Sequence, residues 1–225
     1  MMILMTRVGT AQARSEALAS AAIHGLAAVL SAIGLIVLLE LASKSANDWA
    51  ISSIALYGAT LIFSYLIAAL YHGARRRRVR ELFHTFDHCA IFLLIAGTYT
   101  PFALLPLWDH LGWVMFLLVW LLACLGIGIR LFWIRRLHRL APALYLAMGW
   151  LGLAWARPLL ETLGTGALML VVAGGVAYTA GLVFFRWRSL PYGNAVWHGF
   201  VVTGSACHFS AIAFYALPYA GTLGN

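Results

Sequence analysis

The chain has 225 residues, of which 63% are hydrophobic and only 10% are charged. Soluble domains carry about a quarter charged residues, so this composition excludes a soluble protein and indicates a multi-pass membrane protein. The net charge of +8 would favour a nucleic-acid partner in a soluble chain. Here the arginines stand between long apolar runs, so we expect a membrane and no nucleic acid.

Seven apolar runs follow one another along the chain, each near the twenty residues that a helix needs to cross a bilayer. We therefore expect an all-α fold, with seven transmembrane helices packed as a bundle in one domain. That domain covers residues 15–225 and follows a flexible N-terminal tail at residues 1–14. The predicted helices cover residues 17–42, 50–72, 88–107, 112–134, 141–159, 164–185 and 195–217.

The basic residues are distributed unevenly among the segments that join these runs. Thirteen of the fifteen lie in the N-terminal segment or in the second, fourth and sixth loops or their edges, and residues 75–78 are four consecutive arginines. Arginine and lysine accumulate on the cytoplasmic side of membrane proteins. The pattern predicts a cytoplasmic N-terminus, a C-terminus outside and a place in the inner cell membrane.

Three polar residues meet the cytoplasmic face in this topology. His72 ends the second run, Asp87 precedes the third, and His198 opens the seventh. Two imidazoles and a carboxylate suit Zn²⁺, with Asp87 as a ligand or as the base for a bound water. From spacing alone, helix-capping histidines and an Asp87 paired with the arginine loop are the more economical interpretation.

Other polar residues lie within the runs. Glu16, Ser20 and His24 share one face of the first helix, which favours an interhelical hydrogen bond and leaves open a role behind the metal ligands or a contact with substrate. His208 lies about 15 Å deeper than His198, at 1.5 Å per residue. It is either a buried, hydrogen-bonded histidine or part of a substrate path.

Three segments resemble the haemolysin III family, the bacterial branch of the progestin and adipoQ receptor superfamily. They are residues 69–72 (ALYH), residues 86–102 (FDHCAIFLLIAGTYTPF), and AVWH at 195–198 with GSACHF at 204–209. The resemblance implies seven helices and a zinc site near the cytoplasmic face. It also implies that the ligands are one His at the end of helix 2 and two His of an HxxxH motif on helix 7, with an Asp holding the metal-bound water.

His72, Asp87 and His198 carry over directly, but two positions depart from the family pattern. Asn194 stands at the first His of HxxxH, and Ala68 replaces a Ser one turn before His72. Losing one of three nitrogen ligands is expected to weaken zinc binding. The candidates for the third position are His84, which precedes Asp87 by three residues, and Asn194. A metal-free polar network of Ser64 and Asn194 is the alternative.

The expected function is that of a zinc-dependent hydrolase, because related family members are associated with hydrolysis of lipid amides such as ceramide. Asp87 would be the catalytic base, and a membrane lipid amide or ester would be the substrate. The residues expected around the metal or on the substrate path are Glu16, His24, Ser64, His88 and His208. A metal-poor regulatory or lipid-sensing protein is the alternative, and a pore-forming haemolysin is the third interpretation.

Overall fold

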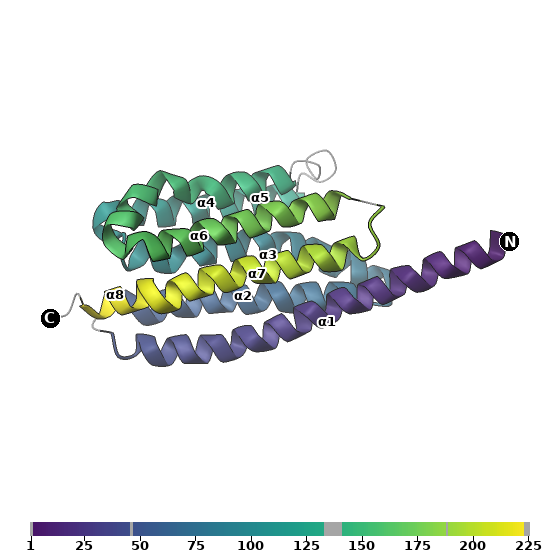
Figure 1. Cartoon of the computed structure of the whole chain (residues 1–225), viewed down its shortest axis with the longest axis horizontal. Helices are drawn as coiled ribbons and strands as arrows, with labels where there is room; N and C mark the ends of the chain where they lie inside the picture. The colour runs from purple at the N-terminus through teal and green to yellow at the C-terminus, as the bar shows by residue number, and fades with distance from the viewer. Residues whose placement is uncertain (1, 46, 133–140, 188, 223–225) are drawn as a thin grey trace.

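The computed structural model describes residues 2–45, 47–132, 141–187 and 189–222, and in these residues it is helical without strands. Figure 1 shows the helices lying side by side along the long axis, with the two termini at opposite ends. The α-helices are α1 (Met2–Ala42), α2 (Trp49–Gly73), α3 (Arg77–Leu104), α4 (Gly112–Phe132), α5 (Ala141–Trp150), α6 (Ala156–Arg186), α7 (Gly193–Ala211) and α8 (Leu217–Thr222). The shorter elements are the 3₁₀ turns η1 (Trp108–His110) and η3 (Leu151–Trp155) and the π-helical turn η4 (Ile212–Ala216).

Within the described residues, six helical stretches are long and apolar enough to cross a membrane. They are Gln12–Ala42, Trp49–Gly73, Arg77–Leu104, Gly112–Phe132, Ala141–Arg186 and Gly193–Gly221. The all-α membrane class is therefore confirmed. The sequence predicts seven runs, and the difference arises because the predicted fifth and sixth runs join into one stretch of 46 residues. Gly164 interrupts that stretch with a left-handed backbone, φ 79° and ψ 179°.

Two predicted boundaries differ from the structure for one physical reason. Helix α3 begins at Arg77, where the apolar run predicts residue 88, and α1 begins at Met2, inside the segment expected to be a tail. An apolar run marks the part of a helix that sits in hydrocarbon, whereas backbone hydrogen bonding continues into water. The Arg77 guanidinium, 2.8 Å from Glu81 one turn later, supports the polar start of α3.

Helix α1 packs against α2 and α7, and this arrangement places its one buried polar stripe inside the bundle. The stripe consists of four buried residues: Ser20, His24, Ala27 and Ser31. Their spacings of four, three and four residues place them on one face of the helix. Large apolar side chains such as Leu26 and Ile33 are exposed on the other faces. Small and polar residues are the usual contacts between membrane helices, so the sequence of α1 directs His24 toward its neighbours.

Candidate metal centre

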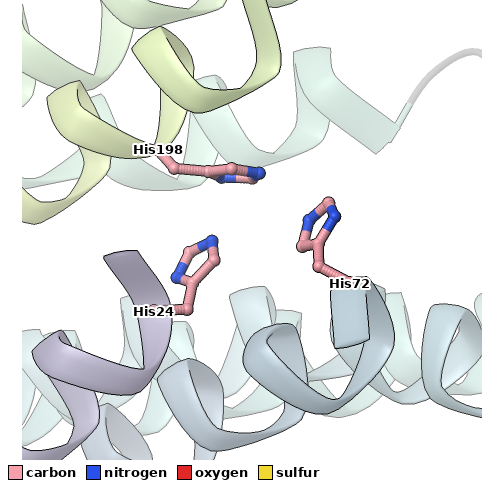
Figure 2. A group of neighbouring side chains, drawn as sticks. All are labelled: His24, His72 and His198. Atoms are coloured by element: carbon pink, nitrogen blue, oxygen red, sulfur yellow. The ribbon is translucent and has the colours of Figure 1, made fainter. Parts of the chain in front are cut away.

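Three imidazoles from three helices converge in the bundle. His24 of α1, His72 of α2 and His198 of α7 each offer a ring nitrogen, and these three atoms all lie within 4.8 Å of one another. Figure 2 shows the three rings facing a common point. The ring centroids of His24 and His198 are 4.2 Å apart, those of His72 and His198 are 4.7 Å apart, and those of His24 and His72 are 5.9 Å apart. We refer to these residues as the histidine trio.

The trio is enclosed, and several of its nitrogens lack a partner. The exposed fraction is 4% for His24 and 8% for His198, while His72 is half-buried. Both ring nitrogens of His24 and Nε2 of His198 have no hydrogen-bond partner among the described residues. Buried polar atoms without partners are costly inside a membrane protein. Three imidazoles are also the donor set of a catalytic zinc site, so the residues present fit this metal.

A second set of contacts fixes the position of α7 against α1 at the same end of the bundle. One carboxylate oxygen of Glu16 accepts a hydrogen bond from the backbone N–H of Asn194, at 3.0 Å. The hydroxyls of Ser15 and Tyr192 are 2.9 Å apart. A carboxylate at a helix N-terminus also interacts favourably with the helix dipole. Because Glu16 lies two turns before His24 on one face of α1, these contacts align His24 with His198.

The imidazole that the structure places beside His72 and His198 is that of His24, whereas the sequence favours His84 or Asn194 as the third ligand. The Nδ1 atom of His84 lies 3.3 Å from the Arg130 guanidinium, and its ring lies 4.4 Å from that of His88. His84 therefore belongs to a neighbouring cluster on α3. The Asn194 side chain is exposed, and its backbone serves the contact with Glu16.

Asp87 lies in the cluster on α3 and is half-buried there. Its Oδ2 is 3.9 Å from Nδ1 of His88, which in turn lies 2.9 Å from the carbonyl of His84. The His84 ring contacts the ring of Tyr71, the neighbour of His72, with centroids 5.2 Å apart. Asp87 lies one turn further along α3, so the two residues are separated by about 5 Å along the helix axis. Among the described residues no carboxylate joins the trio itself.

The remaining predicted site residues are distributed along the same helices. Ser64 is buried on α2, two turns before His72, and Ala68 is buried between them. His208 of α7 lies deeper, with Nε2 3.1 Å from the Val171 carbonyl of α6. The sequence does not single out Tyr65, whose ring centroid is 5.7 Å from that of His24. The available signal was its position seven residues before His72, on the same face of a helix.

The fold and the trio together define an integral membrane protein with a histidine centre inside its helical bundle. The profile of the family described as Haemolysin-III related matches residues 12–209. The chain is 41% identical to Hemolysin-3 of Bacillus cereus over 216 residues, covering 96% of this chain and 98% of that protein. It is 36% identical to the Hemolysin-3 homolog of Bacillus subtilis over 202 residues, covering 90% and 95%.

A more distant relative is a human protein. The monocyte to macrophage differentiation factor of Homo sapiens is 30% identical over 171 residues, covering 71% of this chain and 68% of that protein. No solved structure matches the chain. The chain belongs to the haemolysin III family, as its segments in α2, α3 and α7 predict.

Proposed function

We propose that this protein is a zinc-dependent hydrolase that cleaves an amide or ester bond of a membrane lipid. The observation that carries the proposal is the convergence of His24, His72 and His198, whose ring nitrogens lie within 4.8 Å of one another. Both ring nitrogens of His24 and Nε2 of His198 are buried without a partner among the described residues. Three protein imidazoles with an open fourth position are typical of catalytic zinc. Zinc held there would supply Lewis acidity toward water and toward the substrate carbonyl.

In this proposal Asp87 moves the proton. Hydrolysis bonds the oxygen of water to the carbonyl carbon and breaks the bond to the leaving nitrogen or oxygen. Asp87 accepts a proton from the attacking water and returns it to the leaving atom, as a general base and then a general acid. One support is position along the helix, because Asp87 lies one turn of α3 from His84, whose ring contacts Tyr71 beside His72. A second support is that Asp87 is half-buried beside His88.

We also propose that the chain crosses the membrane seven times, with its N-terminus in the cytoplasm. The stretch Ala141–Arg186 has 46 residues, so as one straight helix it would measure about 70 Å. The hydrocarbon core is about 30 Å thick, so this length suits two crossings that turn near Gly164. The positions of the termini at opposite ends in Figure 1 and the distribution of arginines support this topology.

The proposal is tested by incubating the purified protein with an N-acyl lipid such as a ceramide and measuring the released fatty acid. The zinc-loaded wild type should release fatty acid, and chelation of zinc should stop the release. His24→Ala should be inactive, while His110→Ala, which changes an exposed histidine outside the trio, should retain activity. Equal release by His24→Ala and wild type would refute a catalytic role for the trio.

A regulatory or lipid-sensing function is the second candidate, and Asn194 favours it. Asn194 replaces a histidine of the family motif, and the structure leaves its side chain exposed. A lipid that raises the Tm of the purified protein without being consumed, while the zinc-loaded protein hydrolyses no lipid amide or ester, would favour this function over the hydrolase.

A further inference from the structure

Polar side chains continue from the histidine trio toward the middle of the bundle. Tyr65 lies seven residues before His72 on α2, and Ser205 lies seven residues after His198 on α7. Because α2 and α7 run in opposite directions (Figure 1), both lie about 10 Å from the trio along the bundle, on the same side of it. Tyr65 is 3% exposed and Ser205 is 7% exposed.

Helix α6 adds a third hydroxyl at this level. The hydroxyl of Tyr178 lies 2.7 Å from Oγ of Ser205, and the Tyr178 ring centroid lies 5.7 Å from that of His208. The Tyr65 side chain lies close enough to Tyr178 and Ser205 to interact with both, although its hydroxyl forms no hydrogen bond of normal geometry with a described residue. These four side chains therefore form one group, which we call the inner polar group: Tyr65, Tyr178, Ser205 and His208.

Two glycines make room for this group where α6 and α7 meet. A Cβ atom at Gly204 would lie 2.9 Å from the ring of Tyr178, and one at Gly174 would lie 2.5 Å from Nε2 of His208. Both distances are shorter than carbon atoms tolerate without displacement of a neighbour. Only a glycine at each position leaves space for the polar ring that faces it, so the sequence of both helices accommodates the inner polar group.

The group presents a free donor and a free acceptor. The Val171 carbonyl can only accept, so Nε2 of His208 donates to it at 3.1 Å and Nδ1 remains an acceptor. Neither this Nδ1 nor the Tyr65 hydroxyl has a hydrogen-bond partner among the described residues. Buried polar atoms in folded proteins are normally satisfied, so these two atoms indicate a bound partner. No member of the group is Asp, Glu, Lys or Arg, which favours an uncharged ligand.

We infer that the inner polar group is a second binding site, which holds an uncharged hydroxyl or amide group of a single-chain membrane lipid. A lipid suits the site because the group lies between membrane-spanning helices, about 10 Å from the trio, and the ligands available inside a hydrocarbon layer carry apolar chains. The Tyr65 hydroxyl donates to the ligand oxygen, and Nδ1 of His208 accepts from its hydroxyl or amide hydrogen. This site requires no metal and extends beyond the proposed hydrolase activity.

The test uses the full-length protein in detergent with oleyl alcohol as the probe, and it measures the Kd from ligand-dependent shifts in Tm. Oleyl alcohol should stabilise the wild type, and 1-octadecene, which lacks the hydroxyl, should not. Tyr65→Phe should weaken the Kd for oleyl alcohol at least about fivefold, in line with loss of one hydrogen bond. The matched control Tyr215→Phe, near the other end of α7, should bind like the wild type.

Two further readouts keep the outcome decisive. Tyr65→Phe removes a hydroxyl without a protein partner, so the Tm of the ligand-free variant should equal or exceed that of the wild type. Its zinc content should be unchanged, which separates this site from the metal centre. Equal binding of oleyl alcohol and 1-octadecene, or an unchanged Kd in Tyr65→Phe, would overturn the inference. A lower ligand-free Tm in Tyr65→Phe would also overturn it, because the hydroxyl would then serve the fold.

Discussion

His24 and His198 meet edge to face, with ring centroids 4.2 Å apart, although 173 residues separate them in the chain. The contact joins the first helix of the bundle to α7 and places a third imidazole beside His72. The third imidazole thus comes from α1, in a chain whose α7 carries Asn194 at the first position of the HxxxH motif. This relationship explains how a chain with Asn194 retains three nitrogen donors.

Glu16 should act as a positioning residue for this contact. Its carboxylate accepts a hydrogen bond from the Asn194 N–H at the start of α7, and Gln would keep the shape but lose the charge. The interaction of a charge with a helix terminus is worth about 0.3–1 kcal/mol, so Glu16→Gln should weaken zinc affinity about two- to fivefold. Chelator competition measures the Kd. Glu40→Gln, which removes an exposed pair between α1 and Lys44 just beyond its end, should leave the Kd unchanged.

Asp87→Asn should abolish lipid hydrolysis while the protein keeps its zinc. The amide cannot accept a proton from water, and Asp87 is not part of the trio. General acid–base groups contribute about 10²- to 10⁴-fold to rates, so kcat should fall by at least about a hundredfold. Fatty-acid release and metal content are measured on the same preparation. Wild-type kcat in Asp87→Asn would remove Asp87 from the mechanism.

Restoring the family histidine should compensate for loss of His24. Positions 194 and 198 are one helical turn apart, so a histidine at 194 lies on the face of α7 that carries His198. The double variant His24→Ala with Asn194→His should recover zinc binding that His24→Ala alone loses. The two variants are compared by zinc titration. If the double variant binds no more zinc than His24→Ala, the trio and the family site do not occupy equivalent positions.

Gly181→Ala should destabilise the protein through the contact between α6 and α7. A Cβ atom there would lie 2.6 Å from Phe200 and 2.7 Å from the Trp197 ring, next to His198. Overpacking of this kind costs about 1–3 kcal/mol, so the Tm should fall by several degrees. Gly128→Ala is the matched control, because nothing lies within 4 Å of its added Cβ. Equal Tm values for the two variants would contradict the packing.

The sequence alone predicts the helical membrane class, because apolar run length is a property of single helices. It places His72 and His198 at one end of the bundle, and it groups Glu16, Ser20 and His24 on one face. It does not reveal that this face meets α7, because periodicity identifies residues that share a face but not the helix they contact. The sequence therefore favours His84 over His24 as the third ligand, since His84 lies three residues before Asp87 in the chain.

Zinc content of the purified protein, measured by mass spectrometry beside His24→Ala and His84→Ala, tests the central claim most directly. Wild type and His84→Ala should each hold about one zinc per chain. His24→Ala should lose it, because loss of a ligand exceeds the roughly 10- to 100-fold affinity cost of changing a supporting residue. Zinc retained in His24→Ala, or lost in His84→Ala, would contradict a metal centre built from His24, His72 and His198.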